Sequence, residues 1–358
     1  MKTIRYNLLV VTILMLANLK AQSLINTGNL IQGGLDDGAK LVRAYAEPIN
    51  KAIVFGMANG TYTKIEKQAN HRLLLGLKLA NVAIPSEDMS FDVSKLGLEH
   101  LEAKDPNKTI TRTILGDSLN TITLVSKNKD ILGRPLFEFN TLDGSRSDAM
   151  PLPMLNAAYR MDNTTISVDI IPHVKIPETN LFINMVGVHV QQDAASFIKS
   201  LADQPFAVSL QLGYSMLAGK AALAVKPDGV YSPITITGST TGPYDNQELN
   251  ILYTNLDLGA FADYTFSEKY TLYGGLNYNL GSSRIKLDGR YPIYTSDPTG
   301  FGSVVGEDVD NPLNITDNYT RVKLEIGAQV NWERAYLQLD YTLAQYGGLG
   351  FRLGYKLF

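Results

Sequence analysis

The sequence predicts an all-β protein, a transmembrane antiparallel β-barrel of about 10 to 14 strands with a short N-terminal helical plug segment and long extracellular loops. Three observations lead to this prediction. Apolar and polar residues alternate through about ten segments, which is the period of a strand with two unlike faces. Long and short connections alternate along the chain. The first residues have the pattern of an export signal.

The clearest strand lies between Arg321 and Trp332, where every second residue is apolar and most of the residues between them are charged or amides. The final stretch, Gly348 to Phe358, repeats the alternation and requires a partner strand; the candidates are a neighbouring strand and the first strand, His71–Ile84. Phe358 falls in phase with the basic residues of this stretch. An assembly signal that uses the terminal aromatic residue therefore requires a bulge or an end effect.

The connections favour a membrane barrel. Short turns are expected at Asp162-Asn163, at Ser267–Lys269 and near Glu333, whereas residues 85–150, 219–248 and 282–317 are long and polar. Short periplasmic turns and long extracellular loops are typical of outer-membrane barrels. Within the first long loop we expect a hairpin of Thr109–Leu115 with Thr121–Val125, and part of this loop could fold inward and constrict the lumen.

A soluble secreted β-sandwich would show the same alternation, with its polar face in water. Tyrosines near strand ends favour the membrane barrel, because aromatic girdles lie at the two membrane interfaces. These tyrosines are Tyr264, Tyr270, Tyr341 and Tyr355.

Residues 1–21 are predicted to be a signal peptide. Lys2 and Arg5 precede a short apolar run, Leu8 to Ala17, which is too short for a permanent transmembrane helix of roughly 20 residues. We expect a mature start at Gln22; the alternative is a buried helix of the folded protein. A segment of residues 22–70 and a barrel of residues 71–358 follow.

Residues 22–70 carry a helical pattern. One helix is expected from Leu35 to Tyr45, a second is expected to begin at Pro48, and Asn59-Gly60 is expected to form a turn. The segment could plug the lumen or lie beneath it, and a loosely held periplasmic leader is the alternative.

Composition excludes several classes of function. The net charge of −3 provides no basic field for nucleic acid, and the absence of cysteine excludes disulfides and thiolate metal sites. His71, His100, His173 and His189 lack the spacing of a metal site, and His189 with Ser209 and Ser215 forms no nucleophile motif. We therefore expect no cofactor and no enzymatic activity. Glu307, Asp308 and Asp310 could collect calcium, but a solvated acidic loop is the alternative that their spacing favours.

The candidate functional residues are those expected to face the lumen from the last three strands. They could contact a solute, or they could form an internal ion-pair network that fills a narrow lumen. A barrel of about ten strands is expected to be too narrow for an open channel. The candidates are Arg321, Lys323, Glu325, Gln329, Gln338, Asp340 and Arg352.

The runs Pro151–Met154, Pro205–Tyr214 and Ser90–Leu98, together with the link Ser196–Pro205, resemble an uncharacterised outer-membrane barrel family of Bacteroidota. The segment Ala58–Thr63 matches that family only loosely. More distantly, the layout is similar to that of the long-chain fatty acid transporter family, in which an N-terminal hatch lies inside a barrel. The second resemblance implies passage of hydrophobic molecules, and it rests on layout rather than on shared binding residues.

Two functions remain open at this point. The first is an outer-membrane barrel that admits small hydrophobic molecules past its plug, and the second is a structural or surface-interaction barrel whose loops bind a partner. The expected location is the bacterial outer membrane. The expected partners are outer-membrane lipid, the barrel-assembly machinery and, for the first function, a small hydrophobic ligand.

Overall fold

The computed structural model describes residues 30–31, 34–64, 71–117, 121–130, 132–177, 179–202, 204–226, 236–238, 240–267, 269–296 and 304–357. The predicted signal peptide and Phe358 lie outside these ranges. In the part of the chain that the structure describes, no helix has the length and apolar character needed to cross a membrane.

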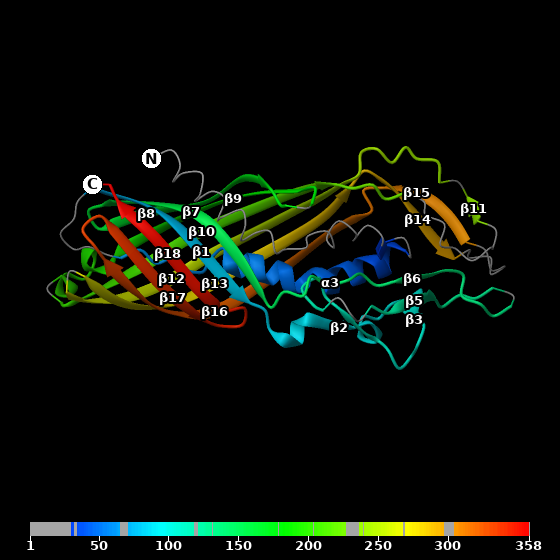
Figure 1. Cartoon of the computed structure of the whole chain (residues 1–358), viewed down its shortest axis with the longest axis horizontal. Coiled ribbons are helices and arrows are strands. Elements are labelled where there is room, and N and C mark those ends of the chain that lie inside the picture. Colours follow the sequence, from blue (N-terminus) through cyan, green and yellow to red (C-terminus); the bar gives the residue numbers. More distant parts are fainter. Residues whose placement is uncertain are drawn as a thin grey trace.

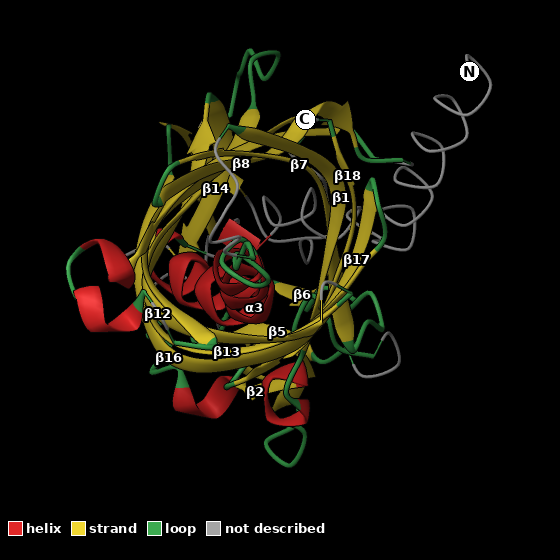
Figure 2. Cartoon of the chain, turned by 90° about the vertical axis from the view of Figure 1, so that its left-hand side faces the viewer, coloured by secondary structure: helices red, strands yellow, loops and turns green. Residues whose placement is uncertain are grey.

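Ten antiparallel strands close into a barrel (Figure 2). The seam forms between the first strand and the last, where Leu75 pairs with Tyr355 and Leu79 with Phe351. The strand number is therefore at the lower limit of the predicted range. Around the barrel the strands are β1 (Arg72–Ala83), β18 (Gly348–Lys356), β17 (Ala335–Leu343), β16 (Leu313–Asn331), β13 (Tyr270–Asp288), β12 (Glu248–Ser267), β10 (Phe206–Ala222), β9 (Leu181–Asp193), β8 (Thr164–Lys175) and β7 (Ala149–Met161).

The outer surface of the barrel carries an apolar belt. On β16, Val322 is 61% exposed and Ile326 is 45% exposed, whereas Lys323 and Glu325 between them are fully buried inside. Exposed apolar area on this scale is unfavourable in water, so the belt defines a surface for lipid. Tyr264, Tyr270 and Tyr355 lie near the ends of their strands and are exposed, as expected for a girdle.

Four strands, β10, β12, β13 and β16, continue beyond the belt, and their polarity reverses there (Figure 1). On β13, Leu276 and Leu280 point outward in the belt, but beyond it Arg284 is exposed and Ile285 and Leu287 are buried inside. Polar side chains outside and apolar ones inside are typical of a water-soluble wall. We call this part the wall extension. The predicted loops 219–248 and 282–317 were therefore too long, because both ends of each belong to barrel strands.

The long connections form small sheets of their own at the end of the wall extension. In the described part, β14 (Arg290–Ser296), β15 (Val304–Asp310) and β11 (Ile236–Gly238) form one sheet. The connection 84–148 forms two further sheets, which we call the head. The head contains β2 (Ser90–Asp92) paired with β4 (Ile110–Arg112), and β5 (Thr123–Ser126) between β3 (Leu101–Ala103) and β6 (Glu138–Asn140), with the 3₁₀ turns Ser86–Met89 and Val93–Lys95.

The predicted hairpin within 85–150 was wrong. Ile110–Arg112 pairs with Ser90–Asp92, and Thr123–Ser126 pairs with two other strands. Local turn residues suggested the pairing, but non-local partners were available because the connection folds around a helix.

Most of the turns expected at the opposite end of the barrel are present. Asp162 and Asn163 join β7 to β8, with Asp162 at a positive φ of 45°. The link after β9 contains two 3₁₀ turns, Ala194–Ser196 and Lys199–Leu201. We call this the inner end of the barrel, and the end that carries the head the outer end. The outer end also has two short connections, residues 176–180 and 344–347, so loop length does not separate the ends completely.

One helix, α3 (Leu35–Gly56), enters the barrel from the outer end (Figures 1 and 2). The prediction of a helical plug is confirmed, but the prediction of two helices was wrong, because Pro48 lies inside a single helix. Proline removes one helical N–H and disturbs the preceding turn. There the backbone N–H of Ile114, in the head, donates to the carbonyl of Tyr45, 3.0 Å away.

The outer half of α3 is the centre of the apolar core. It is held between the wall extension and the head. Leu41, Val42 and Ala46 of the helix are fully buried. Burying such side chains contributes about 1.5–3 kcal/mol each for residues of the size of leucine or valine, so this packing is a main source of stability for the outer end. The wall contributes Leu217, Leu249, Ile251, Ile285, Leu287, Leu313 and Ile315, and the head contributes Val93, Leu98, Leu101, Ile114, Leu124 and Phe137.

Asp37, in the first turn of α3, joins the helix to the head. Its carboxylate is fully buried and accepts hydrogen bonds from the backbone N–H groups of Glu99, His100 and Leu101 at 2.7–2.9 Å. Hydrogen bonds to a charged acceptor contribute about 1.5–3 kcal/mol each. Asp36 beside it is exposed.

We expect Asp37→Ala to release residues 97–106 from the helix, because three buried N–H groups lose their acceptor. The measurement is limited proteolysis of the purified protein in detergent, with cleavage in this segment at least tenfold faster than in the wild type. Asp36→Ala is the matched control and should be cleaved at the wild-type rate. Equal rates for the two variants would contradict this role of Asp37.

Candidate functional site: the plugged lumen

After α3 the chain continues through the lumen as an irregular segment. Residues 57–60 form the predicted turn, with Gly60 at a φ of 62°, and residues 61–64 carry the chain toward the inner end. We call residues 57–64 the plug segment. A β-carbon at Gly60 would lie 3.2 Å from Asp340. Glycine suits this position because it adopts a positive φ readily and because it has no side chain to fit into the narrow space. All the residues from Met57 to Thr63 are buried.

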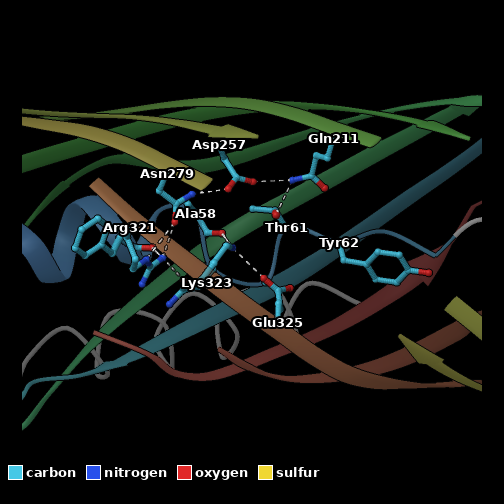
Figure 3. Close-up of polar contacts among 12 residues, drawn as sticks. Ala58, Thr61, Tyr62, Gln211, Asp257, Asn279, Arg321, Lys323 and Glu325 are labelled. Carbon is cyan, nitrogen blue, oxygen red and sulfur yellow. Dashed lines mark hydrogen bonds and ion pairs between the residues drawn. The ribbon is translucent and has the colours of Figure 1, made fainter. Parts of the chain in front are cut away.

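Three cations on the barrel wall hold backbone carbonyls at the end of α3 and in the plug segment, and Figure 3 shows two of them, Arg321 and Lys323. Arg321 donates to the carbonyl of Phe55 at 3.1 Å, and Lys323 donates to the carbonyl of Ala58. These carbonyls lie at the C-terminal end of α3, where the helix dipole is negative and attracts cations. Arg321 also lies over the ring of Phe55, 4.4 Å from its centroid. The wall thus recognises the end of the helix mainly through its main chain.

Arg352 on β18 holds the next part of the plug segment. Its guanidinium donates to the carbonyl of Tyr62 at 3.1 Å and to the carbonyl of Gly60. The side chain is 2% exposed, and it is the largest of the fully buried side chains. The planar guanidinium holds the two carbonyls from two separate nitrogens in a fixed fork, whereas a lysine would offer only one nitrogen on a flexible stem.

Amide side chains complete the contacts on the other walls. Gln211 on β10 donates to the hydroxyl of Thr61 at 2.6 Å and to Asp257 at 3.1 Å (Figure 3). Gln191 on β9 accepts from the backbone N–H of Thr63 at 3.1 Å, and Gln338 on β17 donates to the carbonyl of Tyr62 at 3.3 Å. The plug segment therefore has hydrogen-bond partners on several sides.

Tyr62 fills an aromatic pocket in the wall. Its ring is fully buried, stacks on Tyr273 at a centroid distance of 4.1 Å, and meets Phe261 at 5.3 Å. Phe261 lies flat over Gly275, where a β-carbon would come within 2.2 Å of its ring. Gly275 thus leaves the space that the ring of Phe261 occupies.

We expect Gly275→Ala to lower the free energy of unfolding by about 1–3 kcal/mol, because the new methyl group forces Phe261 toward Tyr62. Gly274→Ala is the matched control. Its β-carbon would have no neighbour closer than 3.6 Å, and its effect should stay within about 0.5 kcal/mol. Urea titration of the detergent-solubilised barrel, followed by its heat-modifiable gel mobility, measures both. A cost for Gly275→Ala no larger than that for Gly274→Ala would contradict the pocket.

Buried carboxylates balance the buried cations. Lys323 pairs with Glu325 at 3.0 Å, and Lys78 on β1 pairs with Asp169 on β8 at 2.8 Å. Asn156 also donates to Asp169, at 2.7 Å, and the ring Nε2 of His189 lies 3.5 Å from it. Because the plug segment is uncharged up to Thr63, the wall charges are matched among themselves rather than by the plug.

All seven candidate residues from the sequence lie inside the barrel. Arg321, Lys323, Gln338 and Arg352 contact the plug directly. Asp340 lies beside Gly60 and Gly350. Glu325 pairs with Lys323, and Gln329 donates to Asn331 on its own strand at 2.8 Å. The structure therefore brings most of the set together around the plug segment.

Sequence reasoning missed partners on the other side of the lumen. Gln191, Gln211 and Asp169 occupy inward positions of strands whose alternation had been recognised. Reading that alternation on every strand would have found them, whereas the candidates were taken only from the last three strands.

Other residues singled out by the sequence have structural contacts. Ser209 accepts a hydrogen bond from Gln191 at 2.8 Å. Asp308 accepts from Tyr244 at 2.6 Å and from two backbone N–H groups, and Asp310 pairs with Arg290 at 3.0 Å. Burial and the neighbouring Asp308 carboxylate raise the pKa of Tyr244 to about 12. Within the described ranges, no three acidic or histidine side chains are grouped as metal ligands.

The lumen has little free space at its inner end. A hollow beside Thr63, Arg160 and Arg352 has a volume of about 20 Å³, which is room for about one water molecule. The arginine, lysine and glutamine side chains of the lumen can bind an extended peptide backbone, because their hydrogen-bond donors are held in fixed positions. The bound peptide is the chain's own plug.

These features define a class of protein. It has the fold of an outer-membrane β-barrel, with an apolar belt for lipid and a polar lumen that its own N-terminal segment closes. The chain belongs to the family of unknown function DUF6588, whose model matches residues 1–357.

Solved structures similar to this chain include several bacterial barrels. The outer membrane protease OmpT from Escherichia coli has 10% identity and a TM-score of 0.29, covering 83% of this chain and 97% of that one. The translocator domain of the autotransporter NalP from Neisseria meningitidis has 12% identity and a TM-score of 0.27, covering 89% and 97%. The toluene transporter TodX from P. putida has 9% identity and a TM-score of 0.24, covering 84% and 70%.

Similarities at this level carry no inference about function. No curated protein matches the sequence.

Proposed function

We propose that this protein is a sealed barrel of the bacterial outer membrane that acts at its outer surface. The barrel anchors it in lipid, the plug closes the lumen, and the head binds a partner or ligand. The supporting observation is where the free space lies. A hollow in the head has a volume of about 480 Å³, against about 20 Å³ for the hollow at the inner end of the lumen.

The hollow in the head has the size and lining of a ligand site. Pockets for small molecules typically have volumes of about 300–1,000 Å³, with apolar walls and a few polar groups. Here Ala103 and Pro106 provide apolar surface, and Glu102 and Lys127 provide charges of opposite sign. Lys127 is fixed by a hydrogen bond to the carbonyl of Leu98. Such a lining suits a ligand with both apolar and polar groups, such as a sugar chain.

Attachment of cells tests this proposal. Cells that produce the protein should adhere to an immobilised glycan surface, such as mucin, more strongly than cells without it. Ala103→Trp, which fills the hollow, should reduce adhesion to the level of cells without the protein. Lys95→Ala, an exposed change nearby, should not. Adhesion that is independent of the protein, or insensitive to Ala103→Trp in a correctly folded barrel, would contradict the proposal.

A second candidate function is the passage of small hydrophobic molecules. The observation in its favour is the apolar inner face of the wall extension, including Leu249, Ile251 and Ile285, which would be uncovered if α3 moved outward. Passage then requires displacement of the plug. It also requires hydrophobic molecules to cross the polar inner half of the lumen, which makes this the less favoured candidate.

A reversible lock on the plug tests transport. Gly281 of β13 packs directly against Val54 of α3, because a β-carbon at Gly281 would lie 2.0 Å from a methyl group of Val54. Cysteines at these two positions should therefore form a disulfide once the end of the helix shifts to relieve the overlap. In liposomes, uptake of a lipophilic fluorescent probe should rise when the disulfide of V54C/G281C is reduced. Equal uptake by liposomes with locked protein, by liposomes with reduced protein and by empty liposomes would contradict a transport function.

Neither function includes a catalytic step or a cofactor. Both place lipid around the belt, and both require the barrel-assembly machinery for insertion into the outer membrane.

A further inference from the structure

The direction of α3 has a consequence for the topology of the whole chain. The helix begins at the outer end, where Asp37 contacts the head and Arg43 pairs with Asp317 at 2.9 Å, near the outer end of β16. It ends inside the barrel, where Arg321 holds it. Figure 1 shows the start of α3 beside the head and its end within the barrel.

The plug segment continues in the same direction to the inner end. Thr63 contacts Gln191. Thr63 and Lys64 line the small hollow at the inner end of the lumen together with Arg72, the first residue of β1. Arg72 pairs with Arg160, close to the inner turn at Asp162. The chain therefore crosses the entire barrel, from the outer end to the inner end, before its first strand begins.

Residues ahead of α3 are also at the outer end. Leu30 and Ile31 are buried against the first turn of the helix, because a β-carbon at Gly38 would lie 2.7 Å from the Cα of Ile31. The backbone N–H of Gly34 donates to the carbonyl of Ile31 at 3.1 Å. The polypeptide at residue 30 has thus not turned back into the barrel.

We infer that the protein carries the N-terminal side of its own plug through the barrel and displays it at the outer face, beside the head. Polypeptide that precedes Leu30 is then tethered at that surface by α3. The tether is strong, because the helix is held by the apolar core and the plug segment by Arg321, Lys323 and Arg352. In the described part of the chain, the inner end of the barrel presents the turns between strands, the link after β9 and the end of β18.

This topology also restricts assembly. An α-helix with its side chains is about 10–12 Å wide, and the lumen around the plug segment is filled by side chains. The helix cannot pass the polar inner half of a closed barrel without displacing those side chains. The inference rests on the outward orientation of the head that the proposed function uses.

Cysteine labelling tests the inference, because the natural chain has no cysteine. Single cysteines are placed at Asp36 in the first turn of α3, at Lys95 in the head and at Asn163 in an inner turn, all of which are exposed. Intact cells are treated with a maleimide on a polyethylene-glycol chain too large to cross the outer membrane. Labelled and unlabelled protein are then separated on a gel.

We expect D36C and K95C to be labelled on intact cells, and N163C only after permeabilisation. Labelling of K95C but not of D36C on intact cells would overturn the inference and leave the proposed function standing. Absence of labelling at K95C with labelling at N163C would reverse the orientation and overturn both. An epitope inserted ahead of Leu30 leaves α3 unchanged and gives a second measurement. Antibody binding to intact cells is expected, and binding only after permeabilisation would overturn the inference.

Discussion

Arg352→Ala is expected to lower the free energy of unfolding by about 3–5 kcal/mol, the usual cost of removing one partner from a buried charge network. Arg352 donates to the carbonyls of Tyr62 and Gly60 and lies within electrostatic reach of Asp169 and Asp340. Its removal takes a donor from both carbonyls, of which that of Tyr62 keeps Gln338, and leaves two buried carboxylates with less positive charge nearby. Heat-modifiable gel mobility across a urea series measures the loss.

Two further variants separate charge from geometry at this position. Arg352→Lys keeps the charge but replaces the two separated guanidinium nitrogens with a single ammonium nitrogen, so it should recover only part of the loss. Arg334→Ala, in the exposed inner turn, removes an arginine outside the lumen and should change stability by less than about 0.5 kcal/mol. A small effect of Arg352→Ala, similar to that of Arg334→Ala, would mean that Arg352 does not hold the plug.

The second large effect is expected at the Lys78–Asp169 pair, which ties β1 to β8 over the intervening strand β7 at 2.8 Å. Lys78→Met leaves Asp169 buried and without its main cation, at a cost of about 3–5 kcal/mol. Asp169→Leu alone leaves Lys78 uncompensated, and a similar cost is expected. The loss of stability should be smaller for Lys78→Met than for Asp169→Leu, because the nearby His189 and Asn156 both lie beside Asp169.

The double variant distinguishes an ion pair from two separate packing effects. Lys78→Met with Asp169→Leu removes both charges, so its loss should be smaller than the sum of the single losses by about 1–3 kcal/mol. The measurement is the same urea series. Additive losses would show that the two side chains do not depend on each other and would contradict the pairing.

Period-2 alternation was sufficient to predict the barrel, because an apolar outer face and a polar inner face can be read residue by residue on β16. It was also sufficient to place Arg321, Lys323 and Arg352 inside. It could not identify what they bind. Their partners include backbone carbonyls of the end of α3 and of the plug segment, as in the contact between Lys323 and Ala58, which are 265 positions apart. Backbone groups carry no side-chain pattern, so the sequence contains no direct signal for such a contact.

The wall extension was missed although its signal is present. After Leu280 on β13 the alternation continues, but its phase reverses, with Arg284 and Lys286 outside and Ile285 and Leu287 inside. The reversal was interpreted as a polar loop. Physically it marks the boundary where the surroundings of the strand change from lipid to water. A search for reversed phase at strand ends would have located this boundary and the core around α3.

The central claim is that α3 and the plug segment occupy the barrel in the membrane. Oxidative cross-linking of V54C with G281C in isolated outer membranes tests it most directly, with V54C and G274C as the control pair because Gly274 lies on the outward face of the same strand. We predict nearly complete disulfide formation, seen as a gel shift that reductant reverses, for the first pair and none for the control. A first pair that stays reduced like the control would contradict the plugged barrel.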